Sequence, residues 1–261
     1  MKVLLLLLQL WLASGFIMQS SRVNVYKTPI NMKKRERSLS PQYNPRTENQ
    51  KRYVQSLSHV DNDLLIAVGP AGTGKTLLAC TYAIQRLSED SIQKIVLTRP
   101  IVTVEEDIGY LPGKLNSKME PWTRPVFDIL SEYYDHRTIT SMLQGGVIEI
   151  APLAYMRGRT FKNSIIIADE MQNSSPNQMM MITTRIGENS KLLITGDLNQ
   201  SDKYENNGLK DLIEKVNAYE NTDGIKICEF NETDIQRSEI VSKMIQIYGG
   251  APRGILPRKP P

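Results

Sequence analysis

The residues best suited to chemistry form one short loop, Gly69 to Thr76, which reads GPAGTGKT. This loop fits the pattern G-x-x-x-x-G-K-[ST], in which backbone N–H groups surround the phosphates of a nucleoside triphosphate. Within it, Lys75 is placed to bridge the β- and γ-phosphates, and the Thr76 hydroxyl to ligate Mg²⁺. The alternative is a glycine-rich turn between a strand and a helix. The residues predicted to bind the nucleotide are Gly69, Pro70, Ala71, Gly72, Thr73, Gly74, Lys75 and Thr76.

Two adjacent carboxylates supply the second chemical feature. The apolar run 164–168 ends in Asp169 and Glu170. In nucleotide-hydrolysing enzymes with this kind of loop, the Asp holds Mg²⁺ and a neighbouring residue orients the attacking water. An apolar strand that ends in Asp-Glu is common by itself, and the alternative is a strand that enters a turn. Its presence beside the loop favours Asp169 as the metal ligand and Glu170 as the residue that polarises water.

Two further polar side chains are candidates for the γ-phosphate. Gln200 follows the apolar run 191–195 and is a candidate γ-phosphate contact, although a Gly-Asp turn would account for Gly196 and Asp197 alone. Arg237 is a candidate source of positive charge for the transferring phosphoryl group. The alternative for Arg237 is an exposed helical residue without a catalytic part.

Short apolar runs rich in β-branched residues predict the strands that position the candidate site residues. Most of the runs lack the alternation of a half-exposed sheet, which indicates a parallel sheet covered by helices on both faces. Strands are predicted at 64–68, 94–98, 147–150, 164–168, 191–195 and 225–230.

Helical stretches lie between most of the strands. Another helix is predicted to start at Thr47, with Gln50 as its capping-box partner. The alternation of strand and helix predicts a doubly wound α/β domain, a three-layer P-loop fold with a mostly parallel central sheet and ligands at the carboxyl ends of the strands. The predicted helices are 75–88, 121–133, 176–187, 207–219 and 234–248.

Composition indicates a globular chain with no sign of a metal cluster. Of the 261 residues, 40% are hydrophobic and 23% are charged, which are globular values. Cys80 and Cys228 have no metal-ligand spacing and are expected to be reduced core residues, and His59 and His136 are not expected to bind metal or act as bases.

The net charge of +4 is unevenly distributed. Residues 1–52 hold 10 Lys/Arg and 2 Asp/Glu, whereas the remainder holds 22 Lys/Arg and 26 Asp/Glu. The basic character therefore belongs to the N-terminal arm. A nucleic-acid site on the folded part would need a local basic groove.

The N-terminal residues resemble targeting signals. Residues 1–20 read as a signal-like apolar segment, too short for a comfortable membrane span, and 21–43 as a basic disordered arm. One interpretation is a two-part presequence of the kind that directs proteins to plastids with extra membranes. The other is an extension of the gene model, with the start at Met18 or Met32. Because ATP and Mg²⁺ are intracellular supplies, a cytoplasmic or organellar location is expected and secretion is not.

The folded domain is predicted to span 44–248, without a stable membrane span, and 249–261 to be a disordered tail rich in Gly and Pro. Across this domain a set of motifs in fixed order resembles the PhoH family of P-loop ATPases, over roughly residues 45–248. The motifs are GPAGTGKT at 69–76, LTRPIV at 97–102, EEDIGYLPGKL at 105–115, PWTRPVFDIL at 121–130, PLAYMRGRTF at 152–161, IIIADEMQN at 165–173 and LLITGDLNQ at 192–200.

The resemblance implies a RecA-like core similar to that of superfamily 1 helicases. It implies that Gln50 contacts adenine and that Lys75 and Thr76 bind phosphates and Mg²⁺. It also implies Asp169 as the magnesium ligand and Glu170 as general base. Gln200 and Arg237 match the γ-phosphate sensor and arginine positions, and the match at Arg237 is weaker because Ser238-Glu239-Ile240 departs from the family pattern.

Partners are also implied by the resemblance. Some members act on RNA, and members form rings, so a homo-oligomeric ring such as a hexamer is expected. Tyr155 with Arg157 and Arg159, and Trp122 near Arg124, are candidates to meet single-stranded nucleic acid by charge and stacking. The alternative for these arginines is subunit contacts or ion pairs within the fold.

The leading hypothesis is therefore a Mg²⁺-dependent ATPase coupled to single-stranded RNA, with possible helicase activity. The main rival is an ATP-dependent switch or assembly protein without nucleic-acid motor activity. A small-molecule phosphotransferase is a third hypothesis, which the absence of an obvious lid insertion in the sequence makes less attractive.

Overall fold

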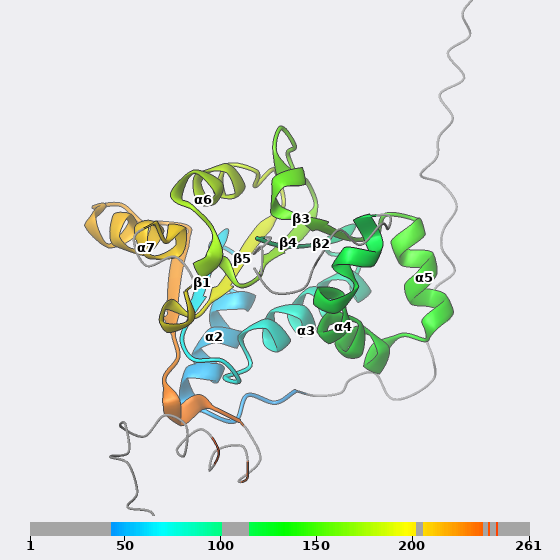
Figure 1. Ribbon diagram of the computed structural model, residues 1–261, viewed down its shortest axis with the longest axis horizontal. Coiled ribbons are helices and arrows are strands. Elements are labelled where there is room, and N and C mark those ends of the chain that lie inside the picture. The colour runs from blue at the N-terminus through cyan, green and yellow to red at the C-terminus, as the bar shows by residue number, and fades with distance from the viewer. Residues whose placement is uncertain (1–42, 101–114, 202–205, 237–239, 241–243, 245–261) are drawn as a thin grey trace, which may run out of the picture. The chain divides into compact units, whose positions relative to one another are not determined.

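Six parallel strands in one sheet form the centre of the computed structural model (Figure 1), which describes residues 43–100, 115–201, 206–236, 240 and 244. The strand order is β3-β2-β4-β5-β1-β6. The sheet is mostly as predicted, and with helices on both of its faces it forms the predicted three-layer α/β fold. The strands are β1 (Leu64–Val68), β2 (Lys94–Arg99), β3 (Ile148–Pro152), β4 (Ser164–Ala168), β5 (Lys191–Gly196) and β6 (Ile225–Glu229).

Burial along the strands explains why their sequences are continuous apolar runs. All five residues of β1 and all five of β4 are buried, because both strands lie inside a parallel sheet that is covered on both faces. At the edge of the sheet, β6 instead exposes Lys226 and Glu229. The position of each strand in the sheet therefore accounts for how apolar its sequence is.

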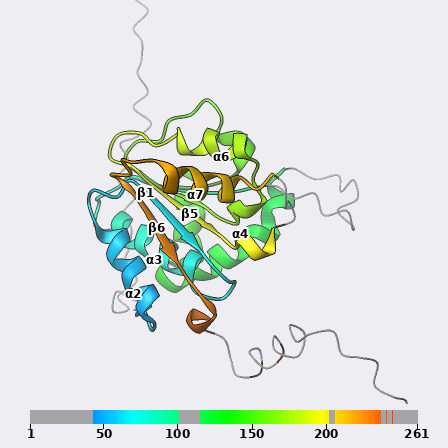
Figure 2. The same cartoon turned by 90° about the vertical axis from the view of Figure 1, so that its left-hand side faces the viewer.

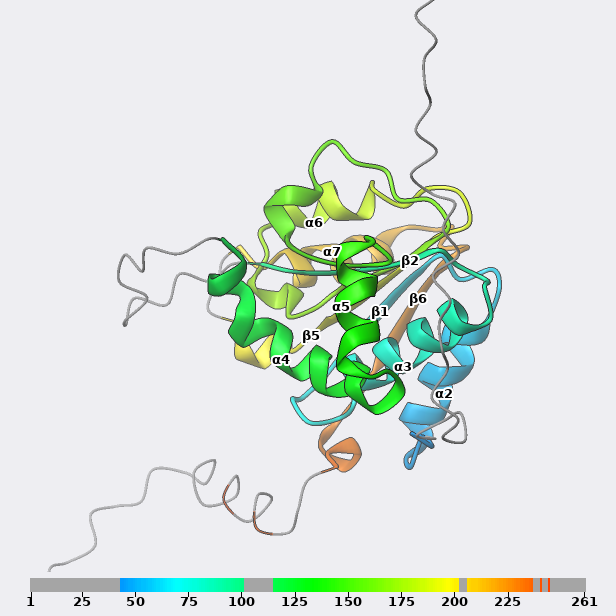
Figure 3. The same ribbon diagram turned by 90° about the vertical axis from the view of Figure 1, so that its right-hand side faces the viewer.

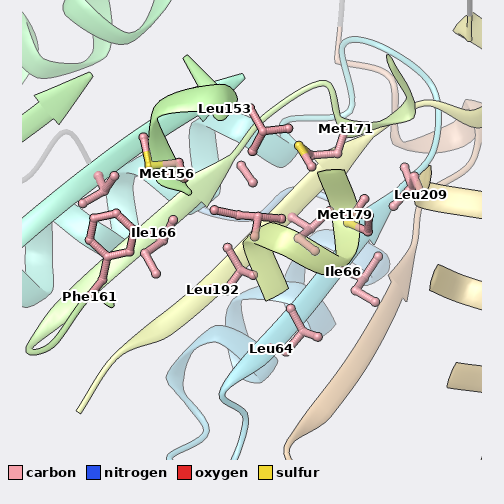
Figure 4. Packing of buried hydrophobic residues seen from close by; sticks show 14 of the residues in the cluster. Leu64, Ile66, Leu153, Met156, Phe161, Ile166, Met171, Met179, Leu192 and Leu209 are labelled. Carbon is pink, nitrogen blue, oxygen red and sulfur yellow. The ribbon is translucent and has the colours of Figure 1, made fainter. Parts of the chain in front are cut away.

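The described helices cover both faces of the sheet in two groups (Figures 1 and 2). The side chains of Leu64, Ile66 and Ile166 on the second face pack with Met179 and Leu209 in one apolar cluster (Figure 4). Figure 3 shows α4 and α5 beside each other on the first face, with α6 on the opposite one. The first group is α2 (Glu48–Ser58), α3 (Lys75–Ser88), α4 (Leu115–Tyr133) and α5 (His136–Gln144), and the second is α6 (Pro176–Thr183) and α7 (Gly208–Ala218).

Parallel pairing brings the carboxyl ends of the functional strands to one edge of the sheet. Val68 of β1 is in register with Gly196 of β5, and Ala168 of β4 is in register with Ile194. The phosphate loop that follows β1, the Asp-Glu pair that follows β4 and the turn that follows β5 therefore start at the same edge.

Several helix boundaries confirm the sequence prediction. Helix α3 spans the predicted 75–88, and α2 begins after Thr47, whose hydroxyl accepts the Gln50 N–H at 3.3 Å in a complete capping box. Helix α4 begins six residues before the predicted 121. The predicted helix 234–248 falls mostly outside the described residues.

Besides the early start of α4, two helical features differ from the prediction. Helix α5 was not predicted, because its sequence HRTITSMLQ buries only Ile139 and Met142; its start is fixed by Asp135, whose carboxylate accepts the Thr138 N–H at 2.8 Å. Helix α6 ends at Thr183 rather than 187, because the chain leaves it to pair Ile186 with Phe161.

Within the described ranges, no helix combines the length and apolar character needed to cross a membrane.

Candidate active site

The phosphate loop has the backbone that its glycines predict. The φ angles of Gly69, Gly72 and Gly74 are 143°, 83° and 85°, a region that other residues rarely adopt. Gly74 occupies the N-cap of α3 in the left-handed conformation. The loop thus ends directly at the positive end of a 14-residue helix, which favours an anion there.

Gly69 is also required for space. A Cβ at this position would lie 2.4 Å from the carbonyl oxygen of Phe230, whose own N–H donates to the Val68 oxygen at 2.7 Å. The chain that follows β6 therefore lies directly against the start of the phosphate loop.

We expect Gly69→Ala to lower the free energy of unfolding by about 3 kcal/mol or more, because backbone strain of ~1–3 kcal/mol adds to the clash with Phe230. Gly158→Ala is the matched control: Gly158 also has positive φ, of 74°, but a Cβ there meets nothing within 4 Å. Gly158→Ala should lower the free energy of unfolding by only about 1 kcal/mol. Urea unfolding of both variants checks the difference, and equal costs would mean that Phe230 does not restrict the loop.

Lys75 lies folded onto its own loop. Its Nζ donates to the Gly69 and Pro70 carbonyl oxygens, both at 2.7 Å, and the side chain is buried. Burial lowers the pKa of Lys75, and the nearby carboxylates of Asp197 and Glu170 oppose that shift. The ammonium is thus held at the loop, ready to exchange carbonyl oxygens for phosphate oxygens.

A hydroxyl and a carboxylate meet beside the loop. The Thr76 hydroxyl donates to Asp169 Oδ1 at 2.7 Å, and the Thr195 hydroxyl donates to the same oxygen. The backbone N–H of Asp169 is fixed by the Thr98 carbonyl at 2.9 Å. Oxygen ligands of this kind suit Mg²⁺, which takes one or two carboxylates and completes its shell with water and substrate phosphates. Thr76 and Asp169 therefore fit the metal role.

Glu170 and Asp169 have different hydrogen-bond partners although they are adjacent in the chain. The φ of Glu170, 54°, is left-handed, which turns the chain after β4. Glu170 Oε2 accepts the Gln172 amide at 2.6 Å, whereas Asp169 Oδ1 accepts the Thr76 and Thr195 hydroxyls. Two adjacent carboxylates with different partners are compatible with two different tasks.

The cavity between these groups has a volume of about 230 Å³. Gln200, in the short turn after β5, lies in its wall together with loop residues and both carboxylates, and its N–H donates to the Asp197 carbonyl at 3.1 Å. The lining residues that sequence reasoning had singled out are Ala71, Gly72, Gly74, Lys75, Thr76, Asp169, Glu170 and Gln200.

Gln50 connects α2 to the phosphate loop. Its Nε2 donates to the Thr73 carbonyl at 3.0 Å, and its Oε1 accepts the Arg46 N–H at 2.7 Å. The side chain is 5% exposed. In this arrangement the amide oxygen caps the helix, so the adenine contact stays a prediction, and the observed role of Gln50 is to hold the loop.

Arg237 lies outside the described residues. Gln236, which precedes it, donates its N–H to the Gly72 carbonyl at 3.0 Å, so the chain reaches the phosphate loop one residue before Arg237.

Sequence reasoning did not single out Gln172 or Thr195, and for Asp197 it kept a Gly-Asp turn as the alternative. Thr195 is a buried hydroxyl at the end of an otherwise apolar strand, and this polar residue was the available signal. Gln172 carried no such signal, because nothing in the sequence indicates that it is buried.

The arginines near β3 separate into two kinds. Arg159 forms a two-bond ion pair with Glu149, with Nη2 at 2.8 Å from Oε2, and its guanidinium lies 4.6 Å from the Phe161 ring centre. Arg157 is exposed, and Tyr155 is 54% exposed. The ion-pair alternative therefore holds for Arg159, whereas Arg157 forms no ion pair with any residue that the structure describes. The side chain of Trp122 lies outside the described residues.

The bonds from Arg159, and then from Lys94, hold the pKa of Glu149 below its usual range. A depressed carboxyl pKa contributes stability that is present above the unfolded pKa and is lost as the pH falls through the folded value. We therefore expect Glu149→Gln to lower the free energy of unfolding by about 1 kcal/mol at pH 7. The difference should shrink as the pH falls through the lowered pKa of Glu149. Urea unfolding across pH tests this, and a pH-independent difference would contradict it.

A family model described as "PhoH-like protein" matches residues 42–249. The chain belongs to the PhoH family. A PhoH-like protein of Bacillus subtilis (strain 168) is 43% identical over 205 residues, which cover 78% of this chain and 63% of that one. Protein PhoH of Escherichia coli (strain K12) is 35% identical over 223 residues, which cover 84% and 61%. This PhoH-family chain thus spans about three fifths of the length of these curated relatives.

Solved structures resemble the PhoH-family chain only distantly. The DUF1998 helicase MrfA bound to DNA matches with a TM-score of 0.44 and 13% identity. The match covers 70% of this chain and 25% of the MrfA chain. Domain III of the Thermotoga maritima replication initiation protein DnaA has a TM-score of 0.35 and 13% identity, with 85% and 79% covered.

Proposed function

We propose that this PhoH-family chain is a Mg²⁺-dependent ATPase whose turnover is coupled to single-stranded RNA. The observation that carries the ATPase part is the hydrogen bond of Thr76 to Asp169 at 2.7 Å beside the phosphate loop, while Glu170 is bonded to a different partner, Gln172. A hydrolase needs two carboxylates with different partners, because one must serve the metal while another orients water.

The residues divide the work of hydrolysis among them. The Thr76 hydroxyl and the Asp169 carboxylate would hold Mg²⁺, which would supply positive charge to offset the negative charge of the phosphates. Lys75 would give up its loop carbonyls for phosphate oxygens. One carboxylate oxygen of Glu170 would remain hydrogen-bonded to the Gln172 amide. The other would orient the attacking water and accept its proton.

The RNA part rests on a local surface and on the family. Residues 53–261 are acidic overall, so long-range attraction to RNA is absent and contact must be local. Exposed Tyr155 and Arg157, two residues apart after β3, offer stacking and charge. Arg159 is engaged with Glu149 and is left out of the proposed surface.

The test is ATP turnover by the full chain with and without single-stranded RNA. Turnover is expected to rise several-fold with RNA, and Arg157→Ala should lose most of that rise while the RNA-free rate is unchanged. Arg52→Ala, which removes an exposed arginine from α2, is the matched control and should behave like the unaltered protein. If RNA neither binds nor changes turnover, the ATP-dependent switch replaces the RNA-coupled enzyme.

We further propose that the chain assembles into a homo-oligomeric ring and works in the cytoplasm or an organelle. One RecA-like domain offers one side of a nucleotide site, and a neighbouring copy is the simplest source of a second side. A size measurement with ATP present tests the ring, and a monomer under those conditions would contradict it.

A further inference from the structure

The buried side chain of Gln172 joins two parts of the site that belong to different strands. It is 1% exposed. Its Nε2 donates to Glu170 Oε2 at 2.6 Å, after β4, and its Oε1 accepts the Asp197 N–H at 3.1 Å, after β5. One amide therefore uses its donor on the proposed water-activating carboxylate and its acceptor on the neighbouring turn.

Gln172 holds the far end of the same turn as well. The Ser201 hydroxyl donates to the Gln172 carbonyl oxygen at 3.1 Å, and Ser201 is buried. Gln200 lies between the two anchored ends, with its own N–H bonded to the Asp197 carbonyl. Gln172 therefore forms hydrogen bonds with both ends of the turn that carries Gln200, at Asp197 and Ser201, and also with Glu170.

Packing leaves the amide little room to move. A Cβ added at Gly196 would lie 2.8 Å from Gln172 Oε1 and 2.5 Å from Leu209 Cδ2. Gly196 is the last residue of β5, so the strand backbone lies directly against the amide. If the side chain of Gln172 served only to fill space, an apolar residue would be sufficient. A buried amide is costly unless it is hydrogen-bonded, and both ends of the Gln172 amide are hydrogen-bonded.

We propose that Gln172 is a positioning residue that fixes Glu170 relative to the turn carrying Gln200. It sets the separation between the carboxylate that activates water and the side chain that contacts the γ-phosphate. This inference rests on the proposed ATPase function, and it concerns kcat rather than nucleotide binding, because Gln172 is absent from the cavity wall.

Gln172→Glu is the sharpest test, because it preserves size and the acceptor for Asp197 while it replaces the donor to Glu170 by a second carboxylate. We expect kcat to fall about 10–100-fold with the ATP dissociation constant within about threefold of the unaltered protein. Two carboxylates at hydrogen-bond distance share a proton, so the acidic limb of the kcat–pH profile should move to higher pH. A purely structural role would instead lower ATP binding and kcat together.

Two further variants keep the test decisive. Gln172→Met removes both hydrogen bonds without adding charge, and should lower kcat while ATP binding is kept. Gln178→Glu is the matched control, because Gln178 also accepts a backbone N–H, from Ser175 at 2.9 Å, but lies in the α6 cap. It should leave kcat and the pH profile unchanged.

The outcomes separate the inference from the proposed function. Unaltered protein that does not hydrolyse ATP would overturn the proposed function itself. Hydrolysis by the unaltered protein, with kcat of both Gln172 variants within twofold of it, would overturn the positioning role alone. The positioning role is also overturned if ATP binding falls in parallel with kcat and the acidic limb of Gln172→Glu does not move.

Discussion

Glu170→Gln is expected to bind Mg²⁺–ATP about as tightly as the unaltered protein and to hydrolyse it at least ~100-fold more slowly. The substitution is nearly isosteric, and the new amide oxygen can still accept the Gln172 amide that Glu170 Oε2 accepts at 2.6 Å. The metal-side contacts of Asp169 with Thr76 and Thr195 are untouched. What is lost is the basic oxygen that takes the proton from water.

Nucleotide binding by fluorescence or calorimetry, combined with phosphate release, checks this expectation. Glu89→Gln is a suitable control, because Glu89 pairs with Arg86 at the far end of α3, away from the phosphate loop. It should leave both quantities unchanged. Parallel loss of binding and hydrolysis in Glu170→Gln would mean that Glu170 is not the base.

Lys75→Ala is expected to abolish detectable hydrolysis and to weaken ATP binding at least ~10-fold, or about 1.4 kcal/mol. Among the described residues of the cavity wall, the ammonium is the only side-chain cation, so none of those residues can replace it on the phosphates. In the structure Nζ contacts Gly69, Pro70 and Thr73, all within the loop that would surround the phosphates.

Equilibrium ATP binding is the measurement for Lys75→Ala, with circular dichroism to verify folding. Lys210→Ala removes an exposed lysine that pairs with Glu214 on α7, and it should bind and hydrolyse ATP normally. If Lys75→Ala keeps its ATP affinity within about threefold, the lysine does not bind the phosphates in the ground state.

Features with a strong local cause were predictable from the sequence. The phosphate loop needs glycines at positive φ, and α3 begins where the glycines end. The capping box of Thr47 and Gln50 lies within four residues, and the buried strands are continuous apolar runs. In each case the residues that form the structure are neighbours in the chain.

Features that depend on tertiary contacts were not predictable. Gln172 gains its partner Asp197 only because β4 and β5 are adjacent in the sheet. Arg159 reads like a nucleic-acid contact in the sequence, but Glu149, ten residues away, neutralises it in the fold. The early end of α6 likewise follows from the pairing of Ile186 with Phe161. Spacing in one sequence does not encode these pairings.

Phosphate release from ATP by the full chain, measured with Mg²⁺ and again with a chelator, tests the proposed ATPase mechanism most directly. We predict steady release that requires Mg²⁺ and disappears in both Lys75→Ala and Glu170→Gln. ATP that binds without phosphate release under any of these conditions, with or without single-stranded RNA, would contradict that mechanism.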